Sequence, residues 1–168
     1  MSTNETYGVH TISLYVNNKP GVLVRVALVF SRRGYNIESL VVSPTAEAGY
    51  ARMTITCSGD EEVFEQIIKQ LAKLVDVVRA EDHTEQDVVE TEVALVKLAV
   101  PMESRTTVLQ IAEHYKAKVV DYSTDTLMLR VYGVGKKLDS MMSLLGNYNV
   151  REVVRSGKIV MTRGLAQT

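Results

Sequence analysis

The order of the apolar patterns restricts the fold most, because one series of strands and helices occurs twice. Residues 9–16 alternate between apolar and polar side chains, as a half-buried strand does. Val22, Val26 and Phe30 then repeat every four residues, as on an amphipathic helix that continues to about residue 33. The other elements expected in this half are strands at 35–43 and 50–58, a helix beginning after Ser58 or Asp60, and a strand at 75–81.

The second half repeats this order. We expect a strand at 91–100, a helix at 104–117, strands at 118–123 and 126–133, a helix from about Val134, and a strand at 150–157, with residues 158–163 as a further edge strand. Matching elements lie roughly 75–83 residues apart, which indicates a structural duplication.

Two such units predict an α+β fold of tandem ferredoxin-like βαββαβ domains. The right-handed crossover rule gives each unit an antiparallel sheet with both helices on one face. We place the first domain at 8–83, an acidic junction at 84–92 and the second domain at 91–163. Residues 81–92 hold six carboxylates and no Lys or Arg, which fits a solvated junction or a metal or partner patch. The uncovered sheet face or edge of each unit predicts a homodimer.

The composition excludes several function classes. A net charge of −1 gives no footprint for nucleic acid, and no apolar run is long enough to span a membrane. The opening letters MSTNETYGVH lack the basic and apolar regions of a signal peptide. The single cysteine, Cys57, fits a reducing compartment, so we expect a cytoplasmic protein.

Catalytic and metal-binding patterns are absent from the sequence. His10, His83 and His114 have no second ligand at metal-binding spacing, so we predict no metal site. Cys57 lies on the apolar face of a strand, as a buried hydrophobic residue does. Met128, Met141, Met142 and Tyr132 are expected in the core. We therefore predict no catalytic residues and no cofactor in this chain.

The loop NNKPG before the first helix is the best candidate for a ligand site. N–H groups in the first turn of a helix have no intrahelical partners, and the dipole there is positive, so a carboxylate fits. Pro20 suits the first helical turn, and Gly21 lets a ligand approach the backbone. The other expected members are the amides of Asn18 and Asn36, the latter from a neighbouring copy, and apolar walls from Val22, Leu23 and Ile37. The alternative is that Pro20 and Gly21 merely start the helix and Gly34 ends it.

The run NNKPGVLVRVALVFSRRGYNIESLVVSPT, followed by RMTI and KQLAKLVDVV, resembles the small, regulatory subunit of acetohydroxyacid synthase (acetolactate synthase). The resemblance covers essentially the whole chain and is most specific in the first half. It implies an N-terminal ACT domain that pairs with a second copy and binds an amino-acid effector at the shared interface. The effector positions that it implies are Asn18, Gly21, Val22, Leu23, Asn36 and Ile37.

The resemblance also implies a function. Such a chain binds valine, activates a catalytic subunit when free and inhibits it when loaded, within branched-chain amino-acid biosynthesis. The implied partner uses thiamine diphosphate, Mg²⁺ and FAD, and none of these is expected in this chain. The alternative is a stand-alone ACT module that senses an amino acid for another enzyme or a transcription factor, although no basic recognition helix is visible. A third hypothesis, an enzyme with its own catalytic site, ranks last because the sequence shows no catalytic pattern.

Overall fold

A computed structural model describes residues 8–168 and divides the chain into two compact units. The first unit extends to Val89 and also includes Lys158–Thr168, and the second is Glu90–Gly157. Residues 158–163, which we expected in the second domain, therefore cluster with the first unit. Residues 1–7 lie outside the described residues, as does most of the stretch that bears on a signal peptide.

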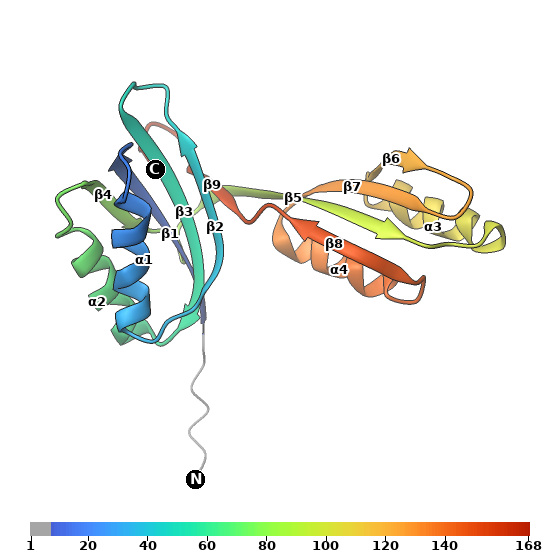
Figure 1. Cartoon of the computed structure of the whole chain (residues 1–168), viewed down its shortest axis with the longest axis horizontal. Helices are drawn as coiled ribbons and strands as arrows, with labels where there is room; N and C mark the ends of the chain where they lie inside the picture. Colours follow the sequence, from blue (N-terminus) through green and yellow to red (C-terminus); the bar gives the residue numbers. More distant parts are fainter. Residues whose placement is uncertain (1–7) are drawn as a thin grey trace, which may run out of the picture. The chain divides into compact units, whose positions relative to one another are not determined.

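The first unit has the expected βαββαβ order. Its elements are β1 (Gly8–Asn17), α1 (Val22–Arg32), β2 (Ile37–Pro44), β3 (Tyr50–Gly59), α2 (Glu61–Leu71) and β4 (Val77–Asp82). The antiparallel sheet has the order β2-β3-β1-β4, so β2 and β4 are its edges. Both helices cover the same face of the sheet (Figure 1).

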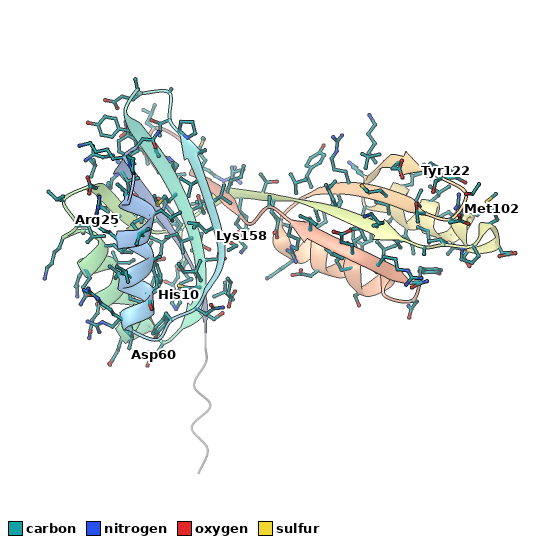
Figure 2. All side chains as sticks on the ribbon, in the orientation of Figure 1. His10, Arg25, Asp60, Met102, Tyr122 and Lys158 are labelled. Atoms are coloured by element: carbon teal, nitrogen blue, oxygen red, sulfur yellow. The ribbon has the colours of Figure 1, made fainter. Side chains whose placement is uncertain are left out.

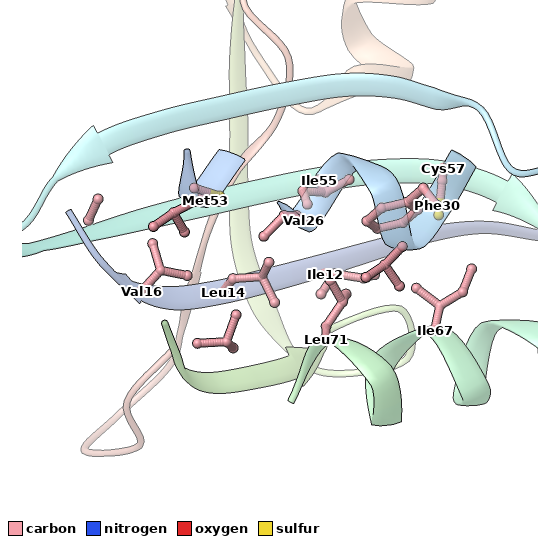
Figure 3. Packing of buried hydrophobic residues seen from close by; sticks show 14 of the residues in the cluster. Ile12, Leu14, Val16, Val26, Phe30, Met53, Ile55, Cys57, Ile67 and Leu71 are labelled. Atoms are coloured by element: carbon pink, nitrogen blue, oxygen red, sulfur yellow. The ribbon is translucent and has the colours of Figure 1, made fainter. Parts of the chain in front are cut away.

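The alternation in β1 determines what this unit buries. Ile12, Leu14 and Val16 are fully buried between the sheet and the helices, where they meet Phe30 of α1 and Leu71 of α2 (Figure 3). Thr11 and Ser13 point to the opposite face of the sheet. The hydrophobic core thus follows directly from the period-two pattern of the sequence.

The second unit repeats the architecture. Its elements are β5 (Val88–Leu98), α3 (Met102–His114), β6 (Lys118–Tyr122), β7 (Leu127–Gly133), α4 (Gly135–Leu145) and β8 (Val150–Arg155), in the sheet order β6-β7-β5-β8. The last strand, β9 (Ile159–Thr162), lies in the segment that clusters with the first unit. Its core includes Leu129, Leu138 and Met141. Tyr132 was wrongly expected in the core. It is exposed on β7, under the ammonium group of Lys137, because its position alternates with the buried Val131.

Backbone hydrogen bonds explain why β2 starts two residues later than expected. Gly34 has a φ of +72° and donates to the Ser31 carbonyl at 3.0 Å, while the Tyr35 N–H donates to the Phe30 carbonyl at 3.1 Å. These two bonds form a Schellman motif that ends α1. Because Tyr35 is part of this helix end, the strand begins only at Ile37. At α2 the expected cap is confirmed, since the Asp60 carboxylate accepts from the Glu62 N–H.

The acidic stretch is less solvated than its composition predicts. The strands β4 and β5 take up both of its ends, and His83 between them is only 3% exposed, bonded to the Ser13 hydroxyl at 2.7 Å. Glu92 is 4% exposed and holds Arg155 through two hydrogen bonds, which raise the pKa of the guanidinium. The expectation of a solvated junction is therefore wrong at these two residues, because each has a partner that is distant in sequence.

We predict that Gly59→Ala destabilises the first unit by about 1–3 kcal/mol, because a methyl group there overlaps the Tyr35 ring. That ring is fixed by its hydroxyl, which accepts the Asp60 N–H at 3.0 Å. Urea denaturation should detect the loss. In a Tyr35→Ala background the same change should have little further effect, and full additivity of the two changes would contradict this explanation.

Candidate functional site

The chain enters α1 through a tight turn. The Val22 N–H donates to the Lys19 carbonyl at 3.4 Å, and Gly21 has φ +83° and ψ −9°. These values, with Pro20 before Gly21, are those of a type II turn, whose third residue needs a positive φ. Pro20 therefore precedes the helix, and its expected place in the first helical turn is wrong. Gly21 occupies the N-cap position.

The start of α1 has neither a cap nor an acidic residue. Gly21 has no side chain to accept a hydrogen bond, and no Asp or Glu lies in the first turn. The Leu23 and Val24 N–H groups therefore face outward at the positive end of the helix dipole. By contrast, α2 has an Asp60 cap and two glutamates in its first turn. Of these two helix starts, only that of α1 is left open to an external anion.

Arg25 also lies at this start of the helix, and no local pattern in the sequence marked it. Its guanidinium pairs with the Asp76 carboxylate at 2.5 Å, and its Nη1 atom would lie 3.2 Å from a Cβ atom placed on Gly21. Figure 2 labels Arg25 on α1. The available signal was its position four residues after Gly21, one helical turn along. The pair to Asp76 is a long-range contact that spacing does not reveal.

The predicted amides lie at opposite ends of the same helix. The Asn18 N–H donates to the Gly49 carbonyl at 2.8 Å, which places the loop beside the β2–β3 turn. Asn36 is exposed and follows the other end of α1. The 11 residues of α1 correspond to a separation of roughly 16 Å. A single chain therefore does not bring Asn18 and Asn36 together.

The three predicted apolar walls differ in position. Val22 points into the hydrophobic core and is 2% exposed, so its side chain does not form a wall, because the helical stripe that begins with it faces the sheet. Leu23 is 41% exposed beside the open helix start. Ile37 is partly buried against the core at the start of β2.

Each of the three histidines contacts other side chains of the chain. His10 is stacked on Phe64, His83 is hydrogen-bonded through both ring nitrogens, and His114 packs edge-on against Tyr115. Among residues 8–168, no group of three His, Cys, Asp or Glu side chains is arranged to hold a metal ion. No described helix is both long and apolar enough to cross a membrane.

Both halves of the chain match acetolactate synthase small-subunit families. Residues 12–79 match the family described as "AHAS small subunit-like ACT domain", and residues 91–164 match "Small subunit of acetolactate synthase". The chain belongs to the acetolactate synthase small-subunit family. It is a regulatory rather than a catalytic chain, of the kind that serves branched-chain amino-acid biosynthesis.

Relatives support the assignment along nearly the whole chain. A "Probable acetolactate synthase small subunit" from Archaeoglobus fulgidus is 42% identical over 92% of this chain and 97% of its own. The small subunit from Mycolicibacterium smegmatis is 40% identical over 92% of this chain and 91% of its own. The crystal structure of the Thermotoga maritima small subunit superposes with a TM-score of 0.83 at 34% identity, over 94% of this chain and 99% of that one. Membership in a small-subunit family implies association with a catalytic large subunit.

We predict that Cys57 makes stability depend on pH. Burial raises the pKa of its thiol from 9.0 to about 11. Above pH 9 the unfolded chain loses this proton and the folded chain keeps it, so unfolding becomes more favourable as the pH rises. The free energy of unfolding of the wild type, relative to Cys57→Ala, should fall between about pH 9 and pH 11 by up to about 1.4 kcal/mol per pH unit. A difference that stays constant with pH would contradict it.

Proposed function

We propose that this chain binds L-valine between the first units of two copies and thereby controls the acetolactate synthase catalytic subunit. The uncapped, acid-free start of α1 beside Gly21 carries the proposal, in a chain whose family is regulatory. The other residues of the proposed site, Asn36 and Ile37, lie at the beginning of β2, away from this loop. The proposal therefore depends on how two copies pair.

Edge strand β2 and the exposed side of α1 supply a surface for pairing. β2 has a neighbour on one side only, so its other side offers unpaired N–H and C=O groups. Val24 and Leu28, one helical turn apart on α1, are exposed, as is Val42 on β2. Pairing two β2 edges by a twofold axis would continue the sheet and bury these side chains against their equivalents.

Such pairing brings the two parts of the site together. The Asn18–Gly21 loop lies at the end of β2, beside Gly49, and Asn36 lies at its beginning. Antiparallel pairing of two β2 strands sets the end of one beside the beginning of the other. The loop of one subunit then faces Asn36 and Ile37 of the second, and each dimer has two equivalent sites.

We call this site, where the loop of one subunit faces Asn36 and Ile37 of the other, the effector seam. Its chemistry suits an aliphatic amino acid. The Leu23 and Val24 N–H groups, at the positive end of the helix dipole, would hold the carboxylate. The side-chain oxygens of Asn18 and Asn36 can accept from the ammonium group. Leu23 and Ile37 would contact the aliphatic side chain.

A ligand that touches two subunits can change their relative orientation, and so the state of a bound partner. We infer that the free chain activates the catalytic subunit and the valine-loaded chain inhibits it, with a typical coupling of about 1–3 kcal/mol. The carbon–carbon bond chemistry belongs to the partner, with thiamine diphosphate, Mg²⁺ and FAD. We place the assembly in the cytoplasm, since Cys57 is a free, buried thiol.

We predict that Gly21→Asp and Asn36→His each weaken valine binding at least about tenfold without dissociating the dimer. The aspartate places a carboxylate where the effector's carboxylate is expected, within reach of Arg25. The imidazole removes the amide and adds bulk. Titration calorimetry on the purified chain measures the affinity, and light scattering the assembly.

Gly133→Asp is the matched control for Gly21→Asp. Gly133 also has a positive φ, +148°, and a Cβ atom placed there meets only the flexible side chain of Lys137. The control shares the backbone strain and a neighbouring basic side chain but belongs to the second unit, so it should bind valine normally. Unchanged affinity in both Gly21→Asp and Asn36→His would rule out this site.

We further propose that the second unit contacts the catalytic subunit through the open face of its sheet. Val93 and Leu95 of β5, Tyr132 of β7 and Val154 of β8 are exposed there, and Leu95 lies directly opposite Val154 in the register. The ion pair between Lys97 and Glu152, at 2.7 Å, lies on the same face. An apolar patch with a charged border is typical of a binding surface.

We predict that Leu95→Glu prevents the chain from activating the catalytic subunit while valine binding stays unchanged. The charge would be placed at the centre of the apolar face. Leu144→Glu is the matched control, because Leu144 is 46% exposed on α4 and Leu95 is 39% exposed. Co-purification with the large subunit and an activation assay measure the effect. Normal activation by Leu95→Glu, or equal losses in both variants, would contradict this contact.

A further inference from the structure

The first unit has a hollow on the face of the sheet opposite its helices. Its volume is about 710 Å³, within the range of small-molecule sites. One wall consists of sheet residues, including Tyr15, Arg52 and Arg79, and the other of residues between Met161 and Thr168. Neither the proposed effector seam nor the core uses these side chains.

Two arginines flank a tyrosine across three strands of this hollow. Tyr15 of β1 lies opposite Arg52 of β3 on one side and Arg79 of β4 on the other. The Tyr15 ring stacks on Tyr50, with the ring centroids 5.1 Å apart. Residues that are direct partners on neighbouring strands have Cβ atoms about 5 Å apart, so both guanidinium groups can reach one ligand.

Most charges around the hollow have partners. The Glu47 carboxylate accepts the Tyr15 hydroxyl at 2.7 Å. Arg79 pairs with Glu81 at 3.4 Å and donates to the main-chain oxygen of Thr168 at 3.0 Å. This last bond shows that Arg79, which lines the hollow, already binds an oxygen acceptor from the chain itself.

Arg52 is the exception. Its guanidinium lies 5.9 Å from the centre of the Tyr15 ring, and no carboxylate between residues 8 and 168 pairs with it. Ser43 lies directly opposite Arg52 on β2 and lines the same hollow, as does Gln167. In the described part of the chain neither side chain has a hydrogen-bond partner. The side chains of Arg52, Ser43 and Gln167 therefore line one hollow as donors, and none of them has a hydrogen-bond acceptor among the described residues.

We propose that this hollow binds a small monocarboxylate with a short aliphatic part, with its carboxylate on Arg52. A guanidinium group binds a carboxylate through two parallel hydrogen bonds, and Ser43 and Gln167 can donate to the same oxygens. Val78, Met161 and Pro44 supply apolar walls. Glu47 and Glu81 lie nearby and disfavour ligands of higher negative charge.

The Met161 methyl group provides a local probe. We would label the methionine methyl groups of the full-length chain with ¹³C and titrate it with isovalerate. Isovaleramide, which has the same shape without the charge, is the ligand control. Met161 lines the hollow, and Met53, buried in the core, is the internal reference. Arg52→Met is compared with Arg151→Met, which removes an exposed arginine of β8 in the other unit.

The proposal predicts a saturable shift of the Met161 resonance with isovalerate and none with isovaleramide. Arg52→Met should weaken the affinity at least about tenfold, and Arg151→Met should leave it unchanged. The absence of saturation, an equal response to the amide, or equal affinity in Arg52→Met would overturn it. A negative outcome would not count against the proposed effector site at α1, because Arg52 is not part of that site.

Discussion

The left-handed backbone of Gly21 is the constraint on which the proposed effector site depends. It lets the chain turn from β1 into α1 within a few residues, and it leaves the first N–H groups of the helix without a capping side chain. Asn18 is then held beside Gly49, at one end of an edge strand. A turn, an open helix start and an unpaired sheet edge thus meet at one corner of the first unit.

Most of the fold could be predicted from the sequence, because its apolar periodicity changes clearly between two and 3.6 residues. The errors fall where contacts distant in sequence decide the outcome. The acidic composition predicts that His83 and Glu92 are solvated. Both are buried instead, and their polar groups are satisfied by hydrogen bonds to Ser13 and Arg155. Likewise, the β-favouring side chain of Tyr35 predicts that it lies in a strand, but its N–H bonds to the end of α1 in the Schellman motif.

The candidate site was only partly predictable, for a related reason. Gly21, Asn18 and Asn36 stand out in the sequence because their residue types suit turns and helix ends. The pairing of Arg25 with Asp76 and the row formed by Arg52, Tyr15 and Arg79 require the strand register, which no local pattern reveals. Val22 shows the opposite error, since its backbone lies at the proposed site while its side chain belongs to the core.

The most direct test of the seam is complementation between two variants that bind valine poorly. If each site combines Gly21 of one subunit with Asn36 of the other, a heterodimer of Gly21→Asp and Asn36→His chains has one seam with both changes and one intact. Equal mixing with free exchange of subunits should restore wild-type affinity at about a quarter of all seams, measured by calorimetry. If the mixture bound valine no better than the separate variants, although the subunits had exchanged, the site would not be shared between subunits.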